Sequence, residues 1–255
     1  MTISSSSLFH FTSNLESLKS ILQHDFVSLY SAETFLNLIS KKHEEIGLNK
    51  AVPMVCFCDI PISKVSRHSG VYGNYAIGLT KEWAIKNQIS PVIYSYSDSA
   101  ISNNLMKMFE AVVKESNEQA INNFDGLVQF IKPYAGDFHR KGQILKNIRF
   151  YDEREWRYIP DIFKDSKNSW LRASQKETLE ESIIATNKIL LETKYSSALL
   201  KFEAKDIKHI IVKNESEIHN LVSFFKSLKS NKYSIEEIEI LMTKINCLED
   251  IIADY

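Results

Sequence analysis

The chain has 255 residues, of which 44% are hydrophobic and 25% are charged, and its formal net charge is −1. These values are typical of a globular protein with a sizeable core, and the near-zero charge gives no electrostatic reason to expect a nucleic acid or a membrane surface as partner. The three cysteines are too few and too poorly spaced for a disulfide framework or a zinc site. No apolar run approaches the about 18 residues that span a bilayer, and the first residues lack the basic and apolar regions of a signal peptide. We therefore expect a cytoplasmic protein without a metal ion.

Hydrophobic periodicity and capping residues predict helices along much of the chain. Residues 13–16 form a capping box for the first helix, Thr80 is the expected N-cap of a later one, and Ser234 forms a capping box with Glu237. In chain order, the expected helices are 15–23, 31–42 with Ser31 as its cap, one that begins at 81, 101–130, 175–194, 215–229 and 234–253. The length and acidic polar face of the segment at about 101–131 predict a helical insertion packed on a sheet.

Runs of β-branched and aromatic residues predict the strands. In chain order, these are 8–12, 53–61, 76–80, 91–96, 151–158, 199–202 and 209–212. The continuously apolar run 53–61, between two prolines, favours a strand buried on both faces. Turns or loops are expected at 47–50, 63–75, 132–146 and 161–174. The pattern predicts a single α+β domain over residues 1–255, with a mixed sheet flanked by helices and with C-terminal helices.

Two places outside the later strands carry candidate ligand-binding residues. Three of the chain's seven glycines fall between residues 70 and 78, interleaved with Tyr72 and Tyr75. Glycine lets a backbone approach a ligand closely, and tyrosines offer flat faces and hydroxyls, so we expect a planar aromatic ligand here; the alternative is a turn whose tyrosines only pack. His10 lies at the end of a strand just before a helix and is placed to meet a polar ligand, although the residues alone favour the alternative, a core histidine bonded to a backbone carbonyl.

The stretch 151–158, Tyr-Asp-Glu-Arg-Glu-Trp-Arg-Tyr, has the densest polar chemistry in the chain. On a strand, Glu153, Glu155 and Arg157 would share one face, opposite a face of aromatic residues and Arg154. Carboxylates two residues apart, about 7 Å along a strand, repel each other unless a cation or a substrate hydroxyl lies between them. We expect an active-site strand, preceded by a basic, substrate-facing loop; the alternative is an edge strand with a ladder of salt bridges.

Four pieces of the sequence resemble the AbiGi family of abortive-infection, phage-resistance proteins. They are Phe-His-Phe-Thr at 9–12, Val-Cys-Phe-Cys-Asp-Ile-Pro-Ile-Ser at 55–63, Tyr-Gly-Asn-Tyr-Ala-Ile-Gly-Leu-Thr-Lys-Glu-Trp at 72–83 and Glu-Arg-Glu-Trp-Arg at 153–157. The order of a histidine, a tyrosine and a glutamate, each on or beside a strand, also resembles the diphtheria-toxin-like class of ADP-ribosyltransferases. That resemblance implies an ADP-ribosyltransferase-like fold and a reaction that cleaves the nicotinamide–ribose bond of NAD and transfers ADP-ribose to a protein or nucleic acid.

The resemblance to transferases also implies roles for individual residues. A carboxylate near the ribose can stabilise an oxocarbenium-like transition state, a histidine would bond the adenosine ribose, a tyrosine would stack on the nicotinamide, and an arginine would pair with the pyrophosphate. The expected catalytic residues are Glu155, Glu153, His10 and Tyr72. The expected NAD-binding residues are His10, Thr12, Arg67, Tyr72, Tyr75 and Arg157.

The AbiGi resemblance implies a second function of a different class. Members of that family are described as antitoxin partners of a nucleotidyltransferase-like toxin, so the chain would be a non-catalytic partner protein that retains an ancestral pocket. A third alternative is an interaction module whose polar strand is structural. No member of the histidine, tyrosine and glutamate set is missing, which favours a working NAD site.

Overall fold

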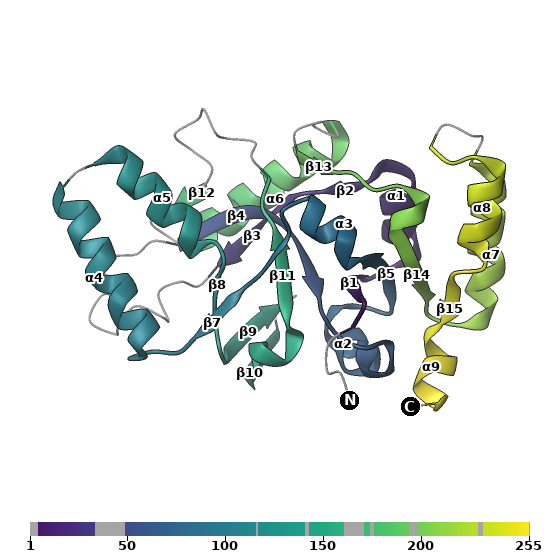
Figure 1. Cartoon of the computed structure of the whole chain (residues 1–255), viewed down its shortest axis with the longest axis horizontal. Coiled ribbons are helices and arrows are strands. Elements are labelled where there is room, and N and C mark those ends of the chain that lie inside the picture. The colour runs from purple at the N-terminus through teal and green to yellow at the C-terminus, as the bar shows by residue number, and fades with distance from the viewer. Residues whose placement is uncertain are drawn as a thin grey trace. The chain divides into compact units, whose positions relative to one another are not determined.

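The computed structural model describes residues 5–33, 49–115, 117–140, 143–160, 171–173, 176–193, 198–228 and 232–254. The chain divides into two compact units. The first comprises Met1–Val27, Val55–Ile89 and Leu199–Tyr255, and the second comprises Ser28–Met54 and Ser90–Ala198. Both contain helices and strands, and the strand pairings are parallel in some places and antiparallel in others (Figure 1). The expected α+β class with a mixed sheet is therefore confirmed.

The sheet of the first unit is built around β1 (Ser7–Thr12). It pairs antiparallel with β5 (Tyr75–Thr80) on one side and with the end of β4 (Asn49–Cys58) on the other. Beyond β5 lies β14 (Ile207–Val212), also antiparallel, and then β15 (Ile245–Cys247), which is parallel to β14. A separate pair joins β2 (Phe26–Val27) to β13 (Leu199–Leu200).

Helices pack against this sheet and supply its core. They are α1 (Leu15–His24), α2 (Val65–Tyr72), α3 (Lys81–Lys86), α7 (Glu215–Ser227), α8 (Ile235–Met242) and α9 (Leu248–Asp254), with single turns at Ile62–Lys64 and Ala204–Asp206. One core cluster gathers Phe9 of β1 with buried residues of β5, β14, α2 and α9. The ring of Phe9 lies over Gly78, where an added Cβ would meet it at 2.8 Å.

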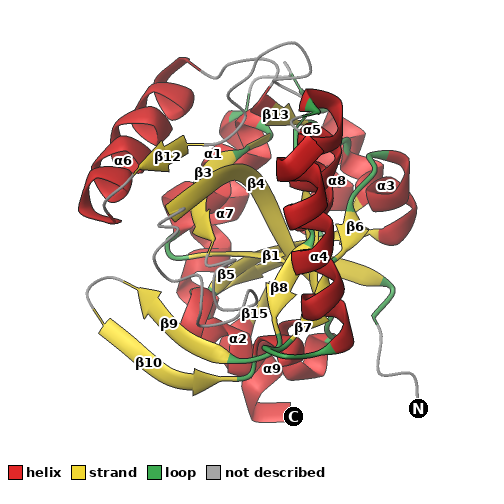
Figure 2. Cartoon of the chain, turned by 90° about the vertical axis from the view of Figure 1, so that its left-hand side faces the viewer, coloured by secondary structure: helices red, strands yellow, loops and turns green. Residues whose placement is uncertain are grey.

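The second unit contains several short strand pairings. β3 (Leu29–Glu33) and β12 (Leu171–Ala173) both pair antiparallel with the first half of β4, and α6 (Lys176–Thr193) packs on β3 and β12 (Figure 2). β6 (Ser90–Pro91) pairs with β11 (Glu155–Tyr158), and β7 (Ile93–Ser95) pairs with β8 (Ile131–Pro133). A hairpin joins β9 (Gly136–Arg140) to β10 (Gln143–Ile148). The expected insertion is the helix pair α4 (Ala100–Glu115) and α5 (Glu118–Val128).

Several expected boundaries are wrong. Ser31 lies inside β3, paired with Val52, and residues 32–33 continue that strand. Residues 34–42 lie outside the described residues. Residues 49–50, expected in a turn, begin β4. Most of the expected loop 63–75 is helical: Gly70 lies within α2, and the helix ends only at Gly73. The expected loop 132–146 contains β8 and the β9–β10 hairpin. Of the expected loop 161–174, residues 171–173 form β12.

The expected C-terminal helix 234–253 is also interrupted. α8 ends at Met242, and the backbone carbonyl of Lys244 accepts a hydrogen bond from the amide of Ile210, so residues 245–247 join the sheet as β15 before α9 begins. The Lys244 ammonium donates to the carbonyls of Ala204 and Ile207. Among the described residues, no helix is both long enough and apolar enough to cross a membrane.

Candidate functional site

The stretch 151–158 is a strand only in its second half. Phe150–Glu153 forms a 3-10 turn, Arg154 adopts the left-handed conformation (φ 47°), and β11 begins at Glu155. The expectation that Glu153 lies on the strand is therefore wrong, because the turn at Arg154 separates it from the strand register. Glu155 and Arg157 do share one face of β11, and both are buried, whereas Trp156 and Tyr158 on the other face are partly exposed.

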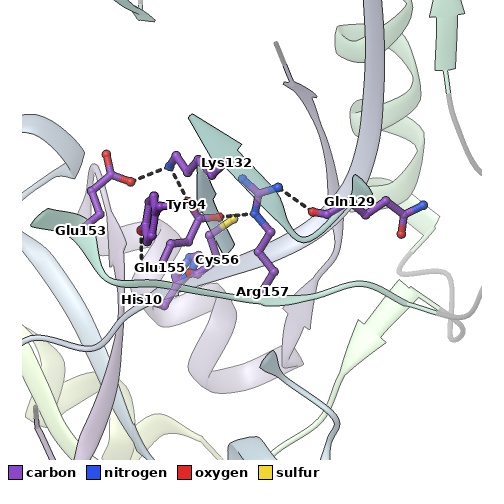
Figure 3. A network of polar contacts seen from close by, with 8 residues as sticks. All are labelled: His10, Cys56, Tyr94, Gln129, Lys132, Glu153, Glu155 and Arg157. Atoms are coloured by element: carbon purple, nitrogen blue, oxygen red, sulfur yellow. Dashed lines mark hydrogen bonds and ion pairs between the residues drawn. The ribbon is translucent and has the colours of Figure 1, made fainter. Parts of the chain in front are cut away.

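A lysine lies between the two carboxylates, as their repulsion requires. The ammonium of Lys132, on β8, donates to Oε2 of Glu153 at 2.6 Å and also to Oε2 of Glu155 (Figure 3). It also lies 5.0 Å from the centre of the Phe150 ring, a cation–π contact. Lys132 begins the segment 132–146 that was expected as a substrate-facing loop, but it was not among the expected site residues, because it precedes its two partners by more than twenty residues.

Arg157 completes the network in the interior. Its side chain is fully buried; Nε donates to Oε1 of Glu155, and Nη1 donates to the carbonyl of Gln129 at 2.7 Å, just beyond the end of α5. The backbone amide of Glu155 donates to the hydroxyl of Tyr94, whose pKa burial raises (Figure 3). The network therefore joins β7, β8, β11 and the end of the helical insertion.

Burial and the two neighbouring cations determine the ionisation of Glu155. Burial alone would raise the pKa of its carboxyl, but the charges of Arg157 and Lys132, and the hydrogen bonds that both donate, lower that pKa to about 2. Two carboxylates are thus matched by two cations. Because each oxygen of Glu155 already accepts from a cation, its charge is largely neutralised where it lies, and such a carboxylate is a weak base and contributes little field to a developing cation elsewhere.

In the first unit, His10 lies among aromatic rings. Its Nδ1 donates to the carbonyl of Cys56 at 2.8 Å, and its ring meets those of Phe26 and Phe57 edge-on at 5.1 and 5.8 Å (Figure 3). Burial lowers its pKa, although the bond to Cys56 opposes that change. The neutral ring with its proton on Nδ1 leaves Nε2 as a hydrogen-bond acceptor. This is the backbone-bonded core histidine that was the alternative expectation.

The neighbouring candidates contact other residues of the first unit. The hydroxyl of Thr12 donates to the carbonyl of Asn14 and closes the turn before α1. Tyr75 is buried in β5, and its hydroxyl donates to Glu217 at 2.7 Å; burial and this carboxylate raise its pKa to about 12. Tyr72, at the end of α2, stacks on His68 with ring centres 5.9 Å apart. The side chain of Arg67 lies outside the described residues.

The expected site residues therefore fall into two groups, one in each unit. His10, Thr12, Tyr72 and Tyr75 belong to the first unit, and Glu153, Glu155 and Arg157 belong to the second. The second group forms a connected polar network, together with Lys132 and Gln129. No cluster of three or more histidine, cysteine or acidic side chains in the described part of the chain could hold a metal ion.

Comparison with known proteins gives two matches. A family model described as "Putative abortive phage resistance protein AbiGi, antitoxin" matches residues 24–213. The chain is also 32% identical, over 223 residues, to an abortive phage resistance protein AbiGi of Lactococcus lactis subsp. cremoris, an alignment that covers 80% of this chain and 89% of that protein. No solved structure matches the chain.

Proposed function

Because the chain belongs to the AbiGi family of abortive phage resistance proteins, we propose that it acts in phage defence as an antitoxin, a non-catalytic protein that binds a cognate toxin and restrains it. The family description names this role. The match covers residues from both compact units, so the role is proposed for the folded chain as a whole.

One structural observation favours binding over catalysis. The carboxylate of Glu155, the strongest candidate for a catalytic group, is buried and neutralised by Lys132 and Arg157. A buried, charge-balanced network is a common way to fix the conformation of neighbouring elements. Here it holds β8 and β11 to the helical insertion, which suits a rigid scaffold that presents a surface to a partner.

Growth of host cells tests the proposal. The toxin is sought among the products of the neighbouring genes, each of which is expressed from an inducible promoter, with and without the chain on a second plasmid. We expect the toxin alone to stop growth and co-expression to restore it, with a frameshifted copy of the chain as the control. Growth arrest that persists despite soluble, folded chain would reject the antitoxin role.

An NAD-dependent transferase is the second candidate. The observation that favours it is the neutral His10, whose Nε2 is an acceptor suited to a ribose hydroxyl. Calorimetric titration of NAD, with Tyr151→Phe as a surface control, tests this reading. Micromolar to millimolar binding that His10→Ala weakens, and nicotinamide release that Glu155→Gln abolishes, would support it; an absence of binding at millimolar NAD would reject it.

A further inference from the structure

The edge of β3 that faces away from β4 carries backbone groups that need a partner. β3 pairs antiparallel with β4 on one side, where Tyr30 lies opposite Pro53. Proline has no backbone N–H to donate, and the amide and the carbonyl of Tyr30 both bond to a residue outside β4. Unpaired N–H and C=O groups on a strand edge form a template on which a strand of another chain can add.

The side chain of Asn187, on α6, occupies this edge. Its Oδ1 accepts from the amide of Tyr30 at 2.7 Å, and its Nδ2 donates to the carbonyl of Tyr30 at 2.9 Å. In an antiparallel ladder, the two residues of a hydrogen-bonded pair exchange two N–H···O bonds in the same way. The carboxamide of Asn187 therefore takes the place of one residue of a partner strand.

The amide of Ser28, two residues before Tyr30, also bonds outside β4. It donates to the carbonyl of Ala198 at 2.8 Å. The alternate amides at residues 28 and 30 are thus bonded to residues 198 and 187, which all belong to the second unit. The start of β3 is therefore closed by α6 and by the residue at the end of that unit, where an edge strand would otherwise be open.

Apolar packing also holds α6 on this sheet, but it has a different effect. Leu179 is buried with Tyr30 and Ala51, and Ile183 and Leu190 pack on the same cluster. Aliphatic side chains have no donor or acceptor, so a helix held by this cluster alone would leave the amide and the carbonyl of Tyr30 without protein partners. Asn187 supplies what these apolar side chains cannot.

We propose that Asn187 blocks the edge of β3 against strand addition by a second copy of the chain. The partner of an opened edge is another β3, because the amide and carbonyl of one Tyr30 complement those of a second when two strands pair antiparallel about a two-fold axis. Such a pairing uses the same edge on both copies. The inference does not depend on the proposed antitoxin role; it concerns how the chain avoids self-association.

Sedimentation velocity of the full chain over a series of concentrations tests the proposal. Asn187→Ala removes both bonds to Tyr30, Asn187→Gln keeps a carboxamide on a longer side chain, and Leu190→Ala weakens the apolar attachment of α6 while keeping Asn187. We expect Asn187→Ala to self-associate at least about tenfold more tightly than the wild type, and Leu190→Ala to stay within about threefold of it. Asn187→Gln should associate less than Asn187→Ala. In the Asn187→Ala dimer, the amide of Tyr30 should exchange with solvent more slowly than in the monomer.

Three results would overturn the inference. The first is equal self-association of the wild type and Asn187→Ala. The second is equal association of Asn187→Ala and Leu190→Ala, since a loosened helix rather than an open edge would then be the cause. The third is an Asn187→Ala oligomer in which the amide of Tyr30 exchanges as fast as in the monomer, because the contact would then lie elsewhere.

A second variant covers the case in which Asn187→Ala does not fold. The carboxylate of Asn187→Asp can still accept from the amide of Tyr30 but cannot donate to its carbonyl. The edge is then half open, and we expect self-association tighter than that of the wild type. A folded Asn187→Asp that associates no more tightly than the wild type would reject the proposal.

Discussion

Glu155 is the residue on which the buried network of the second unit depends, because its carboxylate contacts both Lys132 and Arg157. Glu155→Gln removes the charge that compensates these two cations. We expect a loss of about 3 to 5 kcal/mol of unfolding free energy, the usual cost of breaking a buried ion pair. Urea denaturation measures it. The control is Asp152→Asn, which breaks the exposed pair with Arg149 and should cost less than about 1 kcal/mol; equal losses would contradict the structural role of Glu155.

The lowered pKa of Glu155 predicts that the free energy of unfolding depends on pH. Its pKa is about 2 in the folded chain, against an ordinary 4.5. A lowered folded-state pKa means that the carboxylate stabilises the fold fully above about pH 5, and that this contribution, about 3 kcal/mol, is lost as the pH falls toward 2. The unfolding free energies of the wild type and Glu155→Gln should therefore converge as the pH falls through this range. A constant difference from pH 6 to pH 3 would contradict the lowered pKa.

At position 73 the backbone conformation and the surrounding space both require glycine. Its φ is +121°, and a Cβ there would lie 2.1 Å from the carbonyl oxygen of Thr12. Gly73→Ala should therefore destabilise the fold by more than about 1 kcal/mol. Gly70→Ala is the matched control, since a Cβ at Gly70 meets nothing within 4 Å, and alanine favours a helix by about 1 kcal/mol over glycine. Thermal unfolding should move in opposite directions for the two variants; a shift in the same direction would contradict the structure at Gly73.

At the scale of elements, the attachment of α6 to β3 depends on Asn187. Asn187→Ala leaves the amide and carbonyl of Tyr30 without their side-chain partner, and should cost about 1 to 3 kcal/mol. Hydrogen exchange of the amides of α6 should accelerate. Lys188→Ala, the exposed neighbour, should change stability by less than about 0.5 kcal/mol. Unchanged exchange in Asn187→Ala would show that apolar packing alone holds the helix.

Capping residues and periodicity predicted the elements well where residues close in sequence determine the structure. The caps at Thr80 and Ser234 form as expected, with Ser234 and Glu237 making a reciprocal capping box. At the first helix the expected capping box of residues 13–16 is wrong, because the N-cap is Asn14, whose side chain accepts from the amide of Ser17. Where pairing with a segment far away in sequence determines the structure, the prediction from nearby residues was wrong. Ser31 lies in a strand because it pairs with Val52 of β4. Residues 245–247 form a strand because they pair with β14.

In the candidate site too, the contribution of nearby residues was predictable and the contribution of distant ones was not. The repulsion between the carboxylates at 153 and 155 predicted a cation or a substrate hydroxyl between them, and the ammonium of Lys132 lies there. The identity of that cation was not predictable, because Lys132 comes from another strand and only the fold brings it to Glu153 and Glu155. Likewise, Tyr75 looked available for a ligand, but its partner Glu217 is 142 residues away in sequence.

At the scale of the whole molecule, the chain is an AbiGi family protein of phage defence whose strongest catalytic candidate is buried in a charge-balanced network. The central claim is that it acts by binding a toxin without NAD. Calorimetric titration of the purified toxin into the NAD-free chain tests this claim most directly. We expect saturable binding in the nanomolar to micromolar range that added NAD does not change. An absence of binding, or binding that appears only with NAD, would contradict the claim.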